Sequence, residues 1–216
     1  MILTNLKKRV YTSLALFVLI FLIVKYDTIL LYLLILSGVF SSIEFLTILK
    51  KIYKNKFYIL ISSLLFVSYI FLFCSMFYLL SSFLQTKIIL YSLLLTCIAS
   101  DIGGFIFGKI FKGPKLTKLS PGKTYSGALG SIFLSLSTFP LIIFYYTKNF
   151  NYEFIIAGIF ISIACQFGDL FFSLLKRKAK LKDTGDILPG HGGILDRLDS
   201  ILFGMPVGFL LSIILL

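Results

Sequence analysis

Residues 182–199 carry the side chains best suited to chemistry with phosphates and metals. The stretch holds four acids and the only histidine of the chain, namely Asp183, Asp186, Asp196, Asp199 and His191. Asp196 and Asp199 are three residues apart, so at the start of a helix their carboxylates share one face. Two hard oxygen ligands on one face suit Mg²⁺, which also takes phosphate and water oxygens. The alternative is that these acids only cap the following helix.

Basic side chains lie beside these acids and favour anionic substrates. They are Lys176, Arg177, Lys182 and Arg197. Arginine suits two-point contacts with phosphate oxygens, whereas lysine acts as a point charge. His191 stands between glycines, and we expect it to contact a phosphate; a purely structural role is the alternative.

A second polar segment, residues 120–124, precedes an apolar run. At a helix start, the backbone N–H groups, the Ser120 hydroxyl and Lys123 could bind phosphate oxygens, with Thr124 beside them. A simple turn whose lysines meet anionic lipid is the alternative. The segment is not a Walker A loop, because Thr117 occupies the position of the first glycine and no strand precedes it.

Three further acids, Glu44, Asp101 and Asp169, lie within apolar runs. Each is about 9–12 Å before the first base that follows its run, at 1.5 Å per helical residue. A carboxylate at that depth is costly unless it meets a polar cavity or a cation. Asp101 and Asp169 adjoin the polar loops, which favours a functional role. For Glu44 we expect hydrogen bonding between helices or a snorkelling side chain.

Long apolar runs must position all of these residues. The chain has 216 residues, of which 58% are hydrophobic and 14% charged, and its mean hydropathy is +1.01. This excludes a soluble enzyme or a secreted disulfide scaffold and argues against a nucleic-acid partner. We predict an all-α polytopic membrane protein with about seven transmembrane helices. The predicted spans are residues 10–24, 29–49, 57–84, 88–107, 127–146, 154–175 and 200–216.

The basic residues predict the orientation of these spans. All of the 21 lysines and arginines except Lys25, Lys87 and Lys148 fall on alternate connections. By the positive-inside rule the N-terminus is cytoplasmic, and so is the active site. The first run has no cleavage site after it, so we interpret it as an uncleaved anchor. We predict a single integral membrane domain, residues 1–216, with cytoplasmic functional loops at about 108–126 and 176–199.

Two sets of residues follow the pattern of a known family. The first set is Ser173, Lys176-Arg177, Lys182-Asp183, Gly185, Leu188-Pro189, His191-Gly192-Gly193, Asp196-Arg197 and Asp199. The second is Asp101, Gly104, Gly108, Ser120-Pro121, Lys123-Thr124 and Gly127. The first resembles the signature of the phosphatidate cytidylyltransferases, also called CDP-diacylglycerol synthases, and the second is similar to the family's other block. Together they cover about a third of the chain.

The resemblance implies transfer of cytidylyl from CTP to phosphatidic acid for phospholipid biosynthesis, in a multi-pass protein of the cell inner membrane. It implies Mg²⁺ held by Asp169 and Asp196, with a monovalent cation such as K⁺ beside it. Phe172 and Ser126 stand where family members often carry acids, which weakens the expectation of the second cation. Whether the chain forms a homodimer is left open.

The candidate residues fall into three groups. The catalytic ones are Asp196, Lys176, Arg177, Lys182, Asp183, His191, Arg197 and Asp199; the substrate-binding ones are Ser120, Lys123, Thr124 and Asp101; the metal ligands are Asp169 and Asp196. A secondary transporter or channel would explain the acids within the spans but not residues 182–199. Another CTP-using lipid enzyme, such as a polyprenol kinase or a cytidylyltransferase for a different lipid phosphate, is the second alternative.

Overall fold

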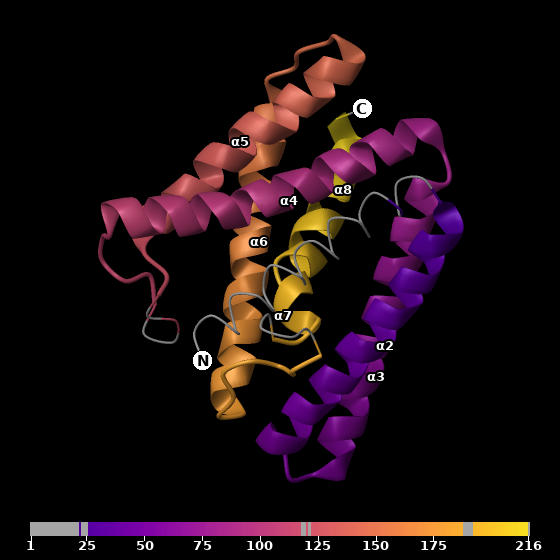
Figure 1. Cartoon of the computed structure of the whole chain (residues 1–216), viewed down its shortest axis with the longest axis vertical. Helices are drawn as coiled ribbons and strands as arrows, with labels where there is room; N and C mark the ends of the chain where they lie inside the picture. Colours follow the sequence, from indigo (N-terminus) through magenta and orange to yellow (C-terminus); the bar gives the residue numbers. More distant parts are fainter. Residues whose placement is uncertain (1–21, 23–25, 118–119, 121, 188–191, 216) are drawn as a thin grey trace. The chain divides into compact units, whose positions relative to one another are not determined.

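The apolar runs form long helices in the computed structural model of the chain (Figure 1). The structure describes residues 22, 26–117, 120, 122–187 and 192–215. Within these residues there are helices and no β-strands, which confirms the all-α prediction. Almost all of the predicted first span, residues 10–24, lies outside the described residues.

Six helices of the described part are long and apolar enough to cross a membrane. They are α2 (Asp27–Ile52), α3 (Lys56–Ser81), α4 (Leu84–Phe111), α5 (Tyr125–Thr147), α6 (Glu153–Lys178) and a last segment formed by α7 (Leu195–Leu198) and α8 (Ile201–Leu215). Each corresponds to one of the predicted spans. The long third run is one continuous helix, α3, rather than two halves.

The chain divides into two compact units. The first unit is Met1–Ser82 with Leu175–Arg197, and the second is Phe83–Leu174 with Leu198–Leu216. The last turn of α6 and most of α7 therefore belong to the first unit. The prediction of a single membrane domain stays a prediction.

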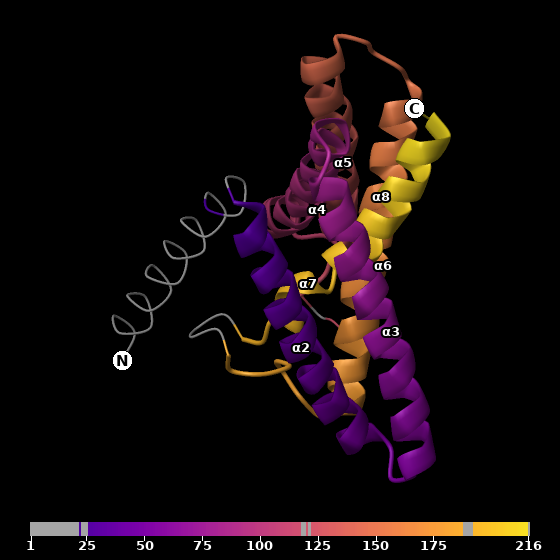
Figure 2. The ribbon, with the colours of Figure 1, turned by 90° about the vertical axis from the view of Figure 1, so that its right-hand side faces the viewer.

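In the first unit, α2 and α3 form an antiparallel hairpin and lie side by side in both ribbon views (Figures 1 and 2). Phe45 of α2 stacks on Phe66 of α3 with ring centroids 3.9 Å apart. The Asn55 side chain accepts a hydrogen bond from the Phe57 backbone N–H at 2.9 Å, which caps the start of α3. A short turn and a stacked aromatic pair thus hold α2 against α3. Glu44 lies in the second half of α2, next to Phe45 of this pair.

In the second unit, α4 and α5 approach closely because glycines face one another. A Cβ on Gly104 would lie 2.7 Å from Ser131 Oγ, and one on Gly127 would lie 2.7 Å from the Gly104 carbonyl oxygen. Small residues let helix backbones pack closely inside membranes, where lipid does not drive association. This contact fixes the start of α5, which follows the polar segment 120–124.

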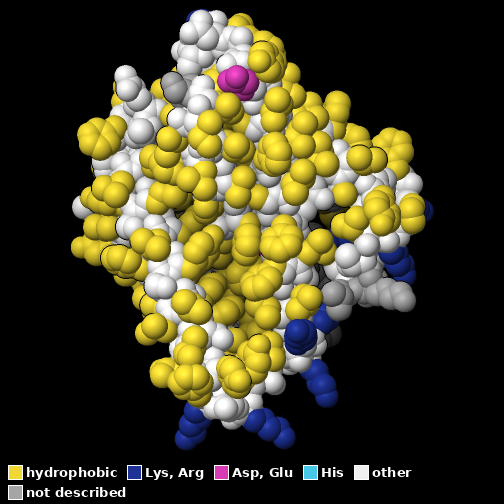
Figure 3. All heavy atoms as spheres, turned by 180° about the vertical axis from the view of Figure 1, so that it is seen from behind, with side chains coloured by type: hydrophobic (Ala, Val, Ile, Leu, Met, Phe, Trp, Pro, Cys, Tyr) yellow, Lys and Arg dark blue, Asp and Glu magenta, His cyan; other side chains and the backbone are white. Residues whose placement is uncertain are grey.

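The outer faces of the helices are apolar. Large side chains such as Phe71, Leu84 and Ile214 are exposed. Hydrophobic side chains cover most of the face shown in Figure 3. A soluble protein rarely exposes so much contiguous apolar surface, so this surface fits a lipid environment.

Candidate active site

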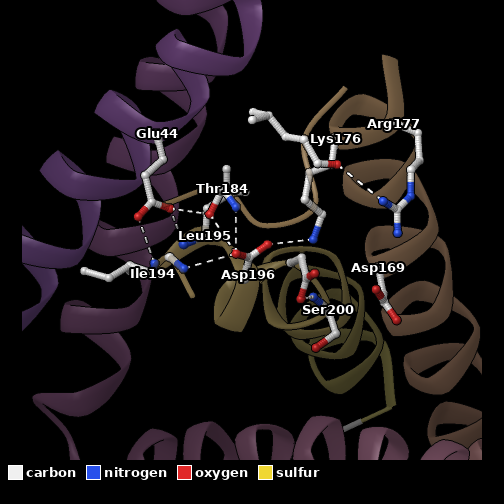
Figure 4. Close-up of polar contacts among 12 residues, drawn as sticks. Glu44, Asp169, Lys176, Arg177, Thr184, Ile194, Leu195, Asp196 and Ser200 are labelled. Atoms are coloured by element: carbon white, nitrogen blue, oxygen red, sulfur yellow. Dashed lines mark hydrogen bonds and ion pairs between the residues drawn. The ribbon is translucent and has the colours of Figure 1, made fainter. Parts of the chain in front are cut away.

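In the first unit, Asp196 is held by a lysine and by backbone N–H groups (Figure 4). Its Oδ1 accepts a hydrogen bond from Lys176 Nζ at 2.6 Å. Its Oδ2 accepts from the backbone N–H groups of Thr184 at 2.8 Å and Gly193 at 3.1 Å. The Lys176 and Asp196 side chains are only 12% and 8% exposed, so this is a shielded, charge-assisted pair. The structure thereby brings together two of the predicted catalytic residues.

Glu44 of α2 also binds this loop. Its Oε1 accepts from the Ile194 N–H at 3.0 Å, and its Oε2 accepts from the Leu195 N–H at 2.9 Å and from Thr184 Oγ1 at 2.7 Å. The carboxylate is therefore hydrogen-bonded to the polar loop and the start of α7. We name these residues, Glu44, Lys176, Thr184, Gly193 and Asp196, the first-unit cluster.

The loop backbone at Gly185, Gly192 and Gly193 lies so close to the Glu44 and Asp196 carboxylates that a side chain would not fit without a shift. A Cβ on Gly193 would lie 2.6 Å from Glu44 Oε1 and would also collide with Thr184 Oγ1. A Cβ on Gly185 would lie 2.8 Å from Glu44 Oε1. Gly192 has φ +82°, a left-handed conformation that favours glycine. Close approach to Glu44 gives the physical reason for Gly185 and Gly193.

The other predicted residues of this loop are exposed. Arg177, Lys182, Asp183 and Arg197 all have exposed side chains. The Arg177 guanidinium donates to the Leu181 carbonyl oxygen at 3.4 Å, a long bond that leaves further donors for another partner. The predicted role of His191 lies outside the described residues. The exposed bases are therefore accessible to an anionic ligand.

The second unit holds a separate polar cluster, which we name the second-unit cluster: Asp101, Lys123, Asp169 and Ser200. Lys123 Nζ lies 2.5 Å from Asp169 Oδ2. Ser200 Oγ donates to Asp101 Oδ2 at 2.7 Å. Asp101 lies close enough to Asp169 and Lys123 to interact with their charges. Two predicted substrate-binding residues thus lie near the predicted metal ligand Asp169.

The loop before α5 has local hydrogen bonds that shape it. The Lys123 N–H donates to the Ser120 carbonyl oxygen at 3.0 Å, and the Leu116 N–H donates to the Lys123 carbonyl oxygen at 2.8 Å. Thr124 Oγ1 accepts from the Gly127 N–H at 3.1 Å and so caps α5. The structure shows capping for Thr124, while a contact of Thr124 or Ser120 with substrate stays a prediction.

Asp199 and Phe172 take positions inside the second unit. Asp199 is buried, and its Oδ1 accepts from the Ser200 N–H at 3.0 Å. Its carbonyl oxygen lies so close to Gly168 that a Cβ there would collide with it. Phe172 is buried, 6.3 Å from the ring centroid of Phe203. An aromatic cluster therefore fills the place where family members often carry an acid.

Carboxylate oxygens are suitable ligands for Mg²⁺, but Asp169 and Asp196 differ in how many of their oxygens are already paired. Among the described residues, no three or more His, Cys, Asp or Glu side chains converge on a point where a metal could bind. Asp169 has one oxygen paired with Lys123, and no described residue donates to the other. Asp196 has both oxygens hydrogen-bonded, so a cation bound through Oδ1 would share that oxygen with Lys176. Asp169 and Asp196 belong to different units, and their sharing of one metal stays a prediction.

Sequence reasoning missed Thr184 and did not place Glu44 in the site. Their partners lie 140 to 151 residues apart in the chain, and no local pattern reveals such contacts. The available signal was an acid within an apolar run together with two glycines, Gly185 and Gly193, in the polar loop.

Comparison with known proteins gives a family match over nearly the whole chain. A model described as "Cytidylyltransferase family" matches residues 3–215. A phosphatidate cytidylyltransferase of Rickettsia felis is 46% identical over 129 residues, which is 55% of this chain and 56% of the relative. The Helicobacter pylori (strain 26695) protein of that name is 42% identical over 112 residues, 52% of this chain and 42% of the relative. The chain spans about half the length of the curated relatives it matches.

Proposed function

The chain belongs to the cytidylyltransferase family, and from this premise we propose that it transfers the cytidylyl group of CTP to phosphatidic acid. The products are CDP-diacylglycerol and pyrophosphate. The match to residues 3–215 carries the proposal, and the names of the similar proteins support the choice of lipid substrate. The lysine-paired carboxylates of the two units fit a reaction between two anionic phosphates.

The reaction needs charge neutralisation more than proton transfer. An oxygen of the lipid phosphate attacks the α-phosphorus of CTP, and the bond from that phosphorus to the oxygen bridging the β-phosphate breaks. Pyrophosphate leaves with the bonding electrons. Because the lipid phosphate is already ionised at neutral pH, no strong general base is required. The main barrier is repulsion between the phosphates, which fixed cations reduce.

In the first unit, we assign phosphate binding to the exposed bases Arg177, Lys182 and Arg197. Their side chains are exposed to solvent, where phosphate oxygens can reach them, and arginine can make two-point contacts. Lys176 differs because Asp196 holds its ammonium in place at 2.6 Å. Asp196 thus fixes the position of the Lys176 ammonium, and the pair as a whole carries no net charge.

In the second unit, we assign triphosphate binding to Lys123 and metal binding to Asp169. The open oxygen of Asp169 and its 37% side-chain exposure support this role. Mg²⁺ bound there would neutralise phosphate oxygens and polarise the α-phosphoryl group. Asp196 is the second proposed ligand on the basis of the family resemblance. A monovalent cation such as K⁺ has no support among the described contacts.

We place the reaction at the cytoplasmic face of the inner membrane. The distribution of lysine and arginine over alternate connections supports this side, and the six apolar helices support a multi-pass protein. There soluble CTP can meet the headgroup of a membrane lipid. A homodimer stays an open prediction.

The position of a radioactive label in CTP tests the proposal against a lipid kinase. Purified chain in vesicles containing phosphatidic acid should move an α-phosphate label into lipid and release a γ-phosphate label as pyrophosphate. A CTP-dependent kinase would instead move the γ-label into lipid. Transfer of the γ-label, or α-label transfer that does not require phosphatidic acid, would contradict the assigned reaction.

A further inference from the structure

Glu44 is a buried carboxylate that the proposed chemistry does not use. It is 3% exposed and lies in the apolar helix α2. A carboxylate at such a position persists only when donors satisfy it. Here three donors at 2.7 to 3.0 Å do so, and all three come from one polar loop and the turn that follows it.

These donors lie in two separate parts of the chain between α6 and α7. Thr184 lies in the first half of the connecting loop, whereas Ile194 is its last residue and Leu195 begins α7. One carboxylate therefore joins these two parts to each other and fixes both to α2 (Figure 4). Backbone donors leave little freedom, because their directions are set by the chain and not by a rotamer.

Thr184 connects Glu44 to Asp196. Its hydroxyl oxygen lies 2.7 Å from Glu44 Oε2 and 3.1 Å from Asp196 Oδ2. A hydroxyl has one proton, so it donates to one carboxylate at a time, and the shorter distance favours Glu44. The backbone N–H of Thr184 then donates to Asp196, together with that of Gly193. The two parts of the loop that Glu44 fixes, at Thr184 and at Ile194–Leu195, thus contain or adjoin the backbone donors that orient Asp196.

We propose that Glu44 is a positioning residue for the active site: it holds Thr184, Ile194 and Leu195 so that Asp196 and Lys176 keep their geometry. The inference rests on the proposed function, because that function gives Asp196 and Lys176 their roles at the active site. Glu44 touches no reacting atom in this account. Gly185 and Gly193 fit the same account, because each leaves room for the Glu44 carboxylate.

Backbone hydrogen exchange tests the contact without reference to activity. In the variant Glu44→Gln the side chain keeps its size but loses one acceptor oxygen, so at least one of the Ile194 and Leu195 N–H groups loses its partner. We expect exchange in residues 192–199 to become about tenfold faster or more, since charged acceptors contribute strongly to such bonds. Glu153→Gln makes the same chemical change at a residue paired only with Asn151 in the described structure, and it should leave residues 192–199 unchanged.

Exchange in Glu44→Gln equal to that of the unaltered protein would overturn the proposal. If this variant does not fold, Thr184→Val is measured on the same segment. It removes the hydroxyl at nearly constant size while Glu44 stays in place. Faster exchange there supports the contact, and unchanged exchange overturns it.

Activity per folded molecule separates positioning from a merely structural role. We expect Thr184→Ser, which keeps the hydroxyl, to retain turnover within about threefold, and Thr184→Val and Glu44→Gln to lose about tenfold or more in kcat. A loss confined to the yield of folded protein, with kcat unchanged, would mean that Glu44 only stabilises the fold. If the unaltered chain makes no CDP-diacylglycerol, the proposed function fails, whereas the exchange result still decides the Glu44 contact.

Discussion

The two polar clusters hold their carboxylates in different ways. In the first unit, backbone N–H groups supply four of the hydrogen bonds to Glu44 and Asp196. In the second unit, side chains contact the carboxylates: Lys123 pairs with Asp169, and Ser200 donates to Asp101. Backbone donors fix a carboxylate rigidly, whereas side chains can move away when a ligand arrives.

This difference assigns a different task to each cluster. In the first-unit cluster, every carboxylate oxygen of Glu44 and Asp196 accepts a hydrogen bond from the protein itself. We therefore expect this cluster to keep its charged groups in fixed places. In the second-unit cluster, one Asp169 oxygen receives no hydrogen bond from the described residues, and Lys123 comes from a loop, so we expect the cluster to rearrange around phosphate and metal. The four predictions below test this contrast.

The largest effect is expected at Asp196. Asp196→Asn removes the charge that holds Lys176 and puts an amide where oxygen accepts hydrogen bonds. We expect turnover to fall about a thousandfold or more while membrane insertion is kept, because a charged group at a reaction centre is lost. Formation of CDP-diacylglycerol by purified protein is the measurement. Near-normal activity would remove Asp196 from the reaction.

Lys123 tests the second-unit cluster. Lys123→Gln removes the positive charge beside Asp169. We expect kcat/KM for CTP to fall about tenfold to a hundredfold, mainly through KM, because charge-assisted phosphate contacts contribute about 1.5–3 kcal/mol. Lys109→Gln, at an exposed position near the end of α4, is the matched control and should change kcat/KM little. Equal effects of the two variants would argue against a specific phosphate contact.

Two glycines compare the packing around the polar loops. Gly193→Ala places a methyl group against Glu44 and Thr184, whereas a Cβ on Gly122 meets no atom within 4 Å. We expect Gly193→Ala to lower the free energy of unfolding by about 1–3 kcal/mol and Gly122→Ala to change it by about 0.5 kcal/mol or less. Thermal unfolding in detergent measures both. Similar losses would show that the first loop is no more tightly packed than the second.

The smallest effect is expected at Ser200. Ser200→Ala removes the hydroxyl that donates to Asp101 at 2.7 Å. We expect a loss of roughly threefold to tenfold in turnover, as for one hydrogen bond of about 1 kcal/mol. Ser137→Ala, whose hydroxyl only donates to its own helix at Phe133, is the control. A loss of more than about a hundredfold would give Asp101 a central role in the reaction.

The helices could be predicted from the sequence because span length depends on local hydropathy. Residues 57–84 were predicted as an apolar run, and α3 follows them closely. The sequence does not predict the short helix α7, Leu195–Leu198, or the turn at Asp199–Ser200 that separates it from α8. Hydropathy marks only the apolar run from residue 200 onward, and α7 lies before that run.

The candidate site could be predicted only in part. Residue types predicted Lys176 and Asp196 as functional, and the structure pairs them across 20 residues of sequence. Composition does not predict that Lys123 pairs with Asp169 or that Glu44 binds Thr184, since these pairings depend on the tertiary fold. The shape of the loop that holds Asp196 is likewise set by a residue of α2, far away in the chain.

The most direct test of the central claim is incorporation of cytidine label from CTP into lipid by the purified chain. The assay uses vesicles with phosphatidic acid, with and without Mg²⁺, and Asp196→Asn as the blank. The account predicts labelled CDP-diacylglycerol that requires both Mg²⁺ and phosphatidic acid and is absent with Asp196→Asn. No labelled lipid from a folded, membrane-inserted protein would contradict it.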